Sequence, residues 1–251
     1  VAGTLSETLI THSPFRSPHH SSSYVSIIGG GAFPKPGEVT LAHRGVLFLD
    51  EFPEFEKRVL ESLREPLEDN VVSISRAKGR ALFPSNFILI AAMNPCPCGF
   101  RGSTLKACTC SPRSIEQYAR KLSGPIIDRI DLWVSVGDIE YKKLQGRSEN
   151  TEGSENYRER VLRARKIQEE RFQNGNKTNS DMSARDIEKF IELDDKLVKL
   201  LELSASRLGL SGRSYHRVLK IARTIADLDN SKDITEAHLL EALQYRPKQL
   251  Y

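Results

Sequence analysis

The pattern of apolar and polar residues changes character along this chain. In the first half, apolar residues form short unbroken runs at 46–49 and 87–93. Runs of this length are typical of parallel strands that are covered on both faces. In the second half, apolar residues recur with the period of a helix, which predicts helices at 157–172, 194–208 and 215–228 and a last helix with Thr235 as its N-cap. The pattern therefore predicts an α/β part followed by an all-α part.

Two carboxylates come directly after the first run. Asp50 and Glu51 follow residues 46–49 without a break. The carboxyl ends of parallel strands meet at one edge of a sheet, where ligands bind, and adjacent acids there are costly unless a cation or water uses them. The pattern matches the Walker B element of ATPases, in which the aspartate holds Mg²⁺ and the glutamate polarises the water that attacks the γ-phosphate of ATP. The alternative is an apolar strand that ends in an acidic turn.

The second run ends in an amide. Asn94 follows the apolar residues and precedes Pro95, so a parallel strand would bring it to the edge that carries Asp50 and Glu51. A neutral amide can hydrogen-bond both the attacking water and the γ-phosphate without adding charge. In an ATPase this is the sensor 1 position.

Weaker patterns surround these strands. They predict a helix at 55–67 that ends near Pro66, a helix at 114–122 and a last strand at 132–136. Between the two main strands, residues 71–83 predict a β-hairpin with a basic tip, formed by Arg76, Lys78 and Arg80. The tip is either a solvated turn or a finger that contacts a nucleic-acid phosphate backbone.

Residues 11–44 are rich in Ser, His, Gly and Pro, which predicts a loop with a short hairpin. The phosphate-binding pattern GxxxxGK[ST] is absent, since Lys35 is followed by Pro36 and no helix is predicted there. His19 and His20 are either metal ligands or solvated side chains that bond to the backbone. Paired histidines in a serine-rich loop favour the second interpretation.

All four cysteines of the chain lie within residues 96–110: Cys96, Cys98, Cys108 and Cys110. Such a cluster in an intracellular protein favours a tetrahedral Zn²⁺ site with thiolate ligands. The spacing is irregular, because one residue separates each pair where two to four are usual. Free thiols, or disulfides in an exported protein, are the alternatives.

Two arginines are candidate phosphate ligands. Arg129 lies between Asp128 and Asp131, just before the predicted strand at 132–136. It either pairs with those acids or serves a neighbouring subunit's nucleotide as an arginine finger. Arg213 follows Gly212 at the start of a predicted helix, where it is either a phosphate ligand or a solvated arginine.

Composition sets the remaining limits. The chain has 251 residues, a net charge of +4 and a pI near 8.8, which permits nucleic-acid binding without requiring it. Its apolar runs are too short to cross a bilayer and no signal peptide is present, so a cytoplasmic protein without membrane contact is expected. Because the chain begins at Val1, we expect a fragment of a longer protein.

Several motifs together resemble one family, the Mg-chelatase-like AAA+ ATPases. The resemblance is to the ComM/YifB branch, covers residues 15–245, and rests on the segments FRSPHHSS, GGGAFPKPGEVTLAHRGVLFLDEFPEF, AAMNPCPCG, IDRIDL and GRSYHRVLKIARTIADLD. It implies an incomplete AAA+ core at 1–137, a linker at 138–154 and a helical lid at 155–251. Within the core it implies a helix-2 insert at 15–44 and a pre-sensor 1 hairpin at 71–83.

The resemblance also implies roles for these residues. Asp50 and Glu51 would be Walker B, Asn94 sensor 1, Arg129 the trans-acting finger and Arg213 sensor 2, with ATP and Mg²⁺ as cofactors. The family's P-loop and Lon-like domain lie upstream, so this fragment is expected to bind ATP weakly and to be inactive alone. The parent is expected to be a hexameric DNA motor for branch migration. A chelatase-type motor acting on a partner protein and a non-enzymatic regulatory ring are the alternatives.

Overall fold

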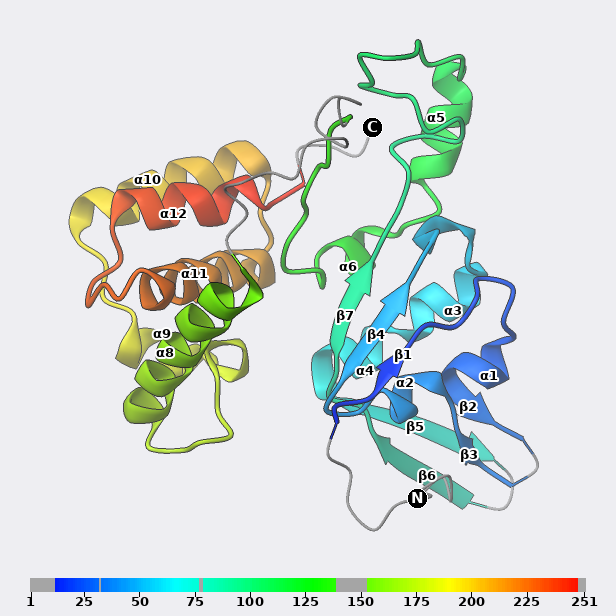
Figure 1. The fold of residues 1–251 in the computed structure, drawn as a ribbon, viewed down its shortest axis with the longest axis horizontal. Coiled ribbons are helices and arrows are strands. Elements are labelled where there is room, and N and C mark those ends of the chain that lie inside the picture. Colours follow the sequence, from blue (N-terminus) through cyan, green and yellow to red (C-terminus); the bar gives the residue numbers. More distant parts are fainter. Residues whose placement is uncertain (1–11, 32, 77–78, 139–152, 248–251) are drawn as a thin grey trace. The chain divides into compact units, whose positions relative to one another are not determined.

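The computed structural model describes residues 12–31, 33–76, 79–138 and 153–247 (Figure 1). The chain divides into two compact units at Arg129 and Ile130. The first unit contains all the strands among the described residues, and the second contains helices α8 to α12. This is the α/β-plus-all-α organisation that the sequence predicts, although the division falls before residue 137.

A small parallel sheet organises the α/β unit. Its strands are β1 (Phe15–Arg16), β4 (Val46–Leu49) and β7 (Ile88–Ala91), in the order β1-β4-β7. Both pairings are parallel, and Leu49 lies opposite Ala91. The prediction of two neighbouring parallel strands is therefore confirmed.

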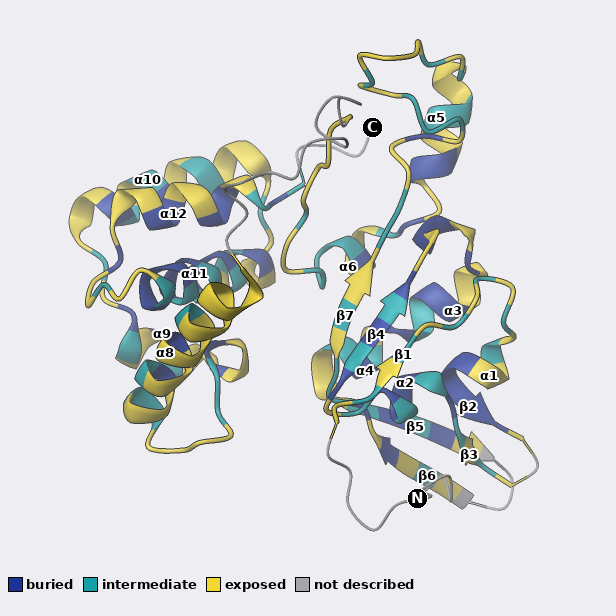
Figure 2. Ribbon diagram, viewed as in Figure 1, coloured by how far each residue is buried: buried dark blue, intermediate teal, exposed yellow. Residues whose placement is uncertain are grey.

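The prediction that both faces of these strands are covered is wrong for the described residues. Leu47 and Leu49 are fully buried, whereas Val46 and Phe48 are half-buried. Strand β7 is more exposed, with Ile88 at 61% (Figure 2). An apolar run indicates that a segment forms a strand, but it does not show how many faces of that strand are covered.

The glycine-rich segment before β4 contains more regular structure than a loop. It forms α1 (Tyr24–Ile28), the two-stranded ribbon β2 (Gly29–Gly30) and β3 (Lys35–Pro36), and α2 (Glu38–Leu41). Gly45 then enters β4 in close contact with the preceding chain, since a Cβ at this position would lie 1.9 Å from Pro14 O. Only glycine allows β1 and β4 to approach at this point.

The helix predicted at 55–67 is divided in two. A 3₁₀ turn, η1 (Phe52–Glu54), leads into α3 (Lys57–Ser62), and α4 (Arg64–Asp69) follows after a break at Leu63. Pro66 lacks the N–H that a continuous helix would need, so it lies in the first turn of a new helix instead.

The predicted hairpin is confirmed as β5 (Val71–Arg76) paired antiparallel with β6 (Gly79–Pro84). Ser85 N–H donates to Asn70 O at 2.8 Å, which closes the base of the hairpin next to the start of β7. Figure 1 places the hairpin beside the amino ends of β4 and β7. It therefore lies at the opposite end of the sheet from Asp50 and Glu51.

Two short helices end the α/β unit. They are α5 (Pro112–Ala119), where a helix at 114–122 was predicted, and α6 (Gly124–Ile127). The strand predicted at 132–136 does not form: Val134 is 70% exposed and Val136 is 86% exposed. Instead Trp133 N–H donates to Tyr245 O at 2.9 Å, and Arg246 donates to Ile130 O at 3.1 Å. This segment belongs to the helical unit because distant residues of that unit supply its hydrogen bonds.

The helical unit packs around one apolar core. Its elements are α8 (Ser154–Phe172), η2 (Asn179–Asp181), α9 (Ala184–Phe190), α10 (Asp195–Leu208), α11 (Gly212–Leu228) and α12 (Glu236–Gln244). Leu201, Val218, Ala222 and Leu239 are fully buried in this core. Figure 2 shows buried residues along α11. Thr235 caps α12 as predicted, while the short helix α9 was not predicted.

Two further predictions concern the linker and membrane-spanning segments. The linker predicted at 138–154 falls almost entirely on residues 139–152, outside the described residues, and α8 begins at Ser154. Within the described ranges, every helix is too short or too polar to cross a bilayer.

Candidate functional site

The two acids lie at the carboxyl edge of the sheet, where the sequence places them. Ala92 N–H donates to Leu49 O at 3.0 Å, and Phe52 N–H donates to Ala92 O at 2.9 Å. Asp50 and Glu51 therefore form a turn that is held on both sides by hydrogen bonds to the strand β7 and its extension. Both side chains are exposed, as a site for a hydrated cation requires.

The backbone of Glu51 adopts a left-handed conformation, with φ 51° and ψ 43°. For a residue with a side chain this conformation costs on the order of 1–3 kcal/mol, and such residues cluster at functional sites. Its N–H donates to Asp50 Oδ1 at 2.8 Å, so the turn holds the two carboxylates in a fixed relation. The hydrogen bonds on either side of the turn maintain this strain.

His20 contacts Glu51 directly. Its Nδ1 lies 2.8 Å from Glu51 Oε2, and its ring stands edge-on to Phe55 with centroids 6.4 Å apart. The neighbouring His19 bonds to Ser21 Oγ at 2.8 Å. Neither histidine belongs to a potential metal-binding group within the described ranges. The solvated interpretation was also incomplete, because it missed the contact of His20 with Glu51.

The sequence contains a signal that could predict the position of His20 beside Glu51. The residue follows β1, and β1 is the parallel neighbour of β4 in the sheet. Residues just beyond the ends of neighbouring parallel strands come together at one edge. The third strand could not be recognised because β1 has only two residues.

Asn94 lies two residues beyond Ala92 at the same edge and is exposed. A Cβ at Gly99 would lie 3.9 Å from Asn94 Oδ1, so the loop after β7 turns back beside this amide. Burial, and then the charge of Glu54, raise the pKa of Tyr118, while a hydrogen bond with the Asn94 backbone lowers it. The residues on both sides of the loop thus hold Asn94 in place.

Arg129 is paired within its own unit. Its side chain is 9% exposed, forms an ion pair with Glu68 of α4 and donates to Pro125 O at 2.8 Å. Sequence reasoning expected a partner among the neighbouring acids, but Asp131 pairs with Arg217. An arginine in this environment can reach a phosphate only after the pair with Glu68 opens.

Arg213 is exposed in the first turn of α11, whose N-cap is Ser211. A positive charge at a helix N-terminus opposes the helix dipole. The phosphate-binding role that the resemblance implies for Arg213 stays a prediction.

The basic hairpin is described in part. Arg80 is exposed and its Nε donates to Ser73 Oγ at 2.8 Å across the two strands. Arg76 lies opposite Gly79 at the end of β5, and Lys78 lies outside the described residues.

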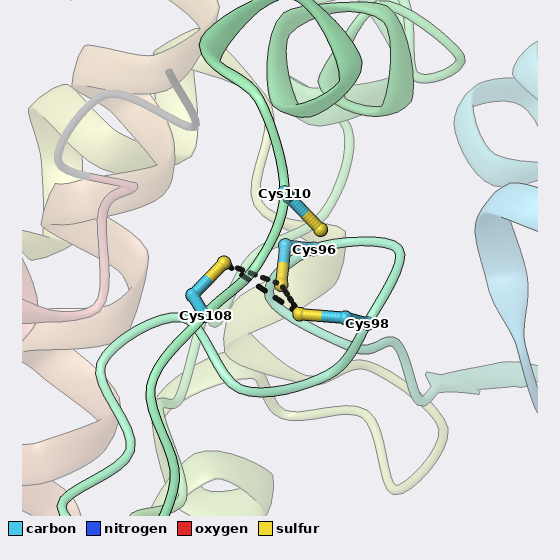
Figure 3. A group of neighbouring side chains, drawn as sticks. All are labelled: Cys96, Cys98, Cys108 and Cys110. Atoms are coloured by element: carbon cyan, nitrogen blue, oxygen red, sulfur yellow. Dashed lines mark hydrogen bonds between the residues drawn. The ribbon is translucent and has the colours of Figure 1, made fainter.

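The four cysteines converge in the loop between β7 and α5 (Figure 3). Their sulfur atoms all lie within 4.8 Å of one another, and no other group of potential metal ligands occurs in the part of the chain that the structure describes. All four are free thiols, so the disulfide interpretation is wrong for this structure. Backbone hydrogen bonds from Phe100 and Thr109 lower the pKa of Cys98 to about 6.

Fold and site together define a class. A parallel sheet with Asp50 and Glu51 at its carboxyl edge, followed by a helical unit, is the arrangement of a partial AAA+ core with a helical domain. The chain belongs to the magnesium chelatase subunit ChlI family. The family model of this subunit matches residues 1–144, and the model of its C-terminal part matches residues 151–246.

Similar curated proteins place the chain in the ComM/YifB branch. It is 48% identical to competence protein ComM of Haemophilus influenzae over 233 residues, and 44% identical to YifB of Escherichia coli over 238 residues. Each alignment covers 93% of this chain and 45% of the relative, so the chain spans about half the length of these relatives. A weaker similarity, 26% identity over 236 residues, links it to the DNA replication licensing factor Mcm6 of Drosophila melanogaster, covering 85% of this chain and 26% of the relative.

Proposed function

We propose that this chain carries the hydrolytic half of an ATP-driven motor. Asp50 would hold Mg²⁺ through water, and Glu51 would polarise the water that attacks the γ-phosphate. The observation that carries this proposal is the strained turn at the carboxyl edge of the sheet, which presents two exposed acids between hydrogen bonds to the Ala92 backbone. Asn94, at the same edge, would orient the attacking water.

His20 adds a positioning role. Its ring nitrogen contacts one carboxylate oxygen of Glu51 at 2.8 Å, which leaves the other oxygen for water. A general base must lie within hydrogen-bonding reach of the proton that it accepts. In the proposed site, His20 fixes the rotamer of Glu51 so that its second oxygen faces the water.

Arg129 and Arg213 would complete the site in an assembled ring. Arg129 would leave Glu68 and reach the nucleotide of a neighbouring copy, where an arginine finger contributes about 10³- to 10⁵-fold in rate. Arg213 would contact phosphate from the start of α11. Both roles require a self-assembled ring, for which we propose a hexamer in the cytoplasm.

We propose DNA as the substrate of the motor, in a branch-migration or helicase activity. The names of two relatives, a competence protein and a DNA replication licensing factor, support this choice. The positive net charge and the basic hairpin with Arg76, Lys78 and Arg80 agree with contact to phosphates. The family description, a magnesium chelatase subunit, supports a second candidate, a motor that acts on a partner protein.

The rate of ATP hydrolysis by the full-length protein, with and without branched DNA, separates these candidates. The full-length protein is needed because GxxxxGK[ST] does not occur in these 251 residues. We expect branched DNA to raise the rate several-fold, with a strong dependence on salt. The double variant Arg76→Ala/Arg80→Ala should lose this stimulation and keep the basal rate, whereas Arg120→Ala, at the exposed C-cap of α5, should behave as wild type.

If DNA does not change the rate of ATP hydrolysis by the wild-type protein, the DNA proposal is contradicted and a motor that acts on a partner protein is favoured. The absence of any hydrolysis in the full-length protein would contradict the motor itself and favour a regulatory ring.

A further inference from the structure

The loop between β7 and α5 brings four sulfur atoms to one point (Figure 3). We infer that Cys96, Cys98, Cys108 and Cys110 bind one Zn²⁺ ion as a tetrahedral tetrathiolate site that holds this loop closed. The inference concerns the metal content of the chain and does not depend on the motor proposed above. A protein without zinc would therefore contradict this inference and leave the ATPase proposal intact. A protein that contains zinc but does not hydrolyse ATP would do the opposite.

The distances between the sulfur atoms match a coordination tetrahedron. A Zn–S bond of about 2.3 Å places the sulfur atoms of a regular tetrahedron roughly 3.8 Å apart. The structure has 3.4 Å from Cys96 to Cys98, 3.7 Å from Cys96 to Cys108 and 3.6 Å from Cys98 to Cys108. Cys110 lies within 4.8 Å of the other three. Small movements would bring all four sulfur atoms to a common ion.

The arrangement does not fit disulfides. A disulfide requires a sulfur–sulfur distance near 2.05 Å, and three of the sulfur atoms here are mutual neighbours at 3.4 to 3.7 Å. Pairing any two of the three would leave the third without a role in the cluster. Four equivalent ligands around one centre account for all three contacts together.

The surrounding backbone suits thiolates. The hydrogen bonds to Cys98 from the Phe100 and Thr109 backbone groups point to its sulfur. Hydrogen-bond donors that orient and stabilise the atoms bound to the metal are typical of metal sites. A tetrahedron of thiolates is typical of structural Zn²⁺ sites, because Zn²⁺ has no d-electron preference against this geometry. Iron is the other metal commonly held by such a ligand set.

Little of this loop is buried against the rest of its unit. Of residues 96–110, only Cys96 is buried, and Leu105 is 61% exposed. Gly99 and Gly102 have positive φ values, 81° and 83°, so the chain turns sharply twice. Long loops without secondary structure lose much conformational entropy on ordering. A metal bound by all four cysteines supplies the stabilisation that an apolar core would supply elsewhere.

The metal content of the purified full-length protein tests the inference directly. We expect about one zinc per chain by elemental analysis, without iron. Titration of the thiols with an organomercurial should release this zinc as the four cysteines react. Replacement by Co²⁺ should give the absorption bands of a tetrahedral cobalt thiolate.

Variants separate loss of the ligand from loss of the fold. Cys98→Ser/Cys108→Ser should contain no zinc, whereas Cys98→His, which keeps a zinc ligand, should retain it. Thr109→Ala, an exposed residue between two ligands, is the matched control and should retain zinc fully. If the double variant does not fold, the zinc contents of the wild-type protein and of Cys98→His still test the inference.

Two results would overturn the inference. One is wild-type protein that remains below about one zinc in ten chains after incubation with equimolar Zn²⁺. The other is a stoichiometric content of a different metal, such as iron, in the purified protein.

Discussion

Carboxylates occupy opposite environments in the two units. In the α/β unit, Asp50 and Glu51 are exposed at a sheet edge, and Glu51 has a strained backbone. In the helical unit, Asp227 of α11 is 1% exposed. Its carboxylate binds Arg171 at 2.7 Å, Asn179 at 2.8 Å and Arg223 at 3.1 Å, in addition to a second contact with Arg171.

In the buried network around Asp227, the arginines have further hydrogen-bond partners besides the carboxylate. Arg223 also donates to Ser231 O at 2.7 Å and to Lys232 O at 2.8 Å, and burial lowers its pKa. Together these bonds join α8, the turn η2, α11 and the connection to α12. A buried charge that is fully bonded specifies packing and has no capacity left for a substrate.

The difference shows how to separate structural from functional charges in this chain. Burial and a full set of partners mark Asp227 as structural, although several charged groups surround it. Exposure, backbone strain and one histidine partner support the catalytic role that we propose for Glu51. Changes at Asp227 should therefore affect stability, and changes at Glu51 should affect chemistry.

The largest effect on stability is expected from Asp227→Ala. The change leaves the buried Arg223 and the half-buried Arg171 without their carboxylate, which should lower the free energy of unfolding by about 3–5 kcal/mol. Chemical denaturation of the helical unit measures it. Asp229→Ala, which removes only the partially exposed partner of His238, is the control and should cost about 1 kcal/mol or less. Equal losses in both variants would contradict the comparison.

A smaller effect, on rate alone, is expected from His20→Ala. Loss of a hydrogen bond to a charged group is worth about 1.5–3 kcal/mol, which predicts a fall of roughly ten- to a hundredfold in kcat for ATP hydrolysis by the full-length protein. His19→Ala, beside it, should stay within about twofold. Steady-state kinetics measure both, and an equal effect of the two changes would argue against the positioning role.

The smallest effect is expected at the capping box of α9. Hydrogen bonds from Ser183, and then from Lys177, hold the pKa of Asp186 well below its ordinary value of 3.8. Because the native pKa is lowered, the stabilisation is present above pH 3.8 and is lost as the pH falls through the native value. Asp186→Asn should lower the melting temperature by a few degrees at pH 7, and the difference from wild type should shrink in acid. A difference that is independent of pH would contradict this account.

The sequence predicted those elements whose signals are local. Strand β4 follows from an unbroken apolar run, the hairpin of β5 and β6 from two segments that flank a basic turn, and the helix α11 from apolar periodicity. Thr235 was recognised as an N-cap because capping depends on neighbouring residues. Asp50 and Glu51 were placed correctly because they follow a strand directly.

Features that depend on distant partners were missed. The apolar residues at 132–136 suggested a strand, but Trp133 bonds to Tyr245 and no strand pairs with this segment in the described structure. Likewise Arg129 pairs with Glu68 rather than with an acid beside it in the sequence. The contact between His20 and Glu51 requires the order β1-β4 in the sheet. Spacing along the chain contains none of this information.

The most direct test of the central claim is a paired measurement on Glu51→Gln in the full-length protein. The account predicts that hydrolysis of saturating ATP falls by about 10²- to 10⁴-fold, as for loss of a general base, while the free energy of unfolding stays within about 0.5 kcal/mol of wild type. Glu56→Gln, at another exposed glutamate that is the N-cap of α3 and makes no side-chain cap bond, is the control. A Glu51→Gln protein that hydrolyses ATP within about twofold of the wild-type rate would contradict the account.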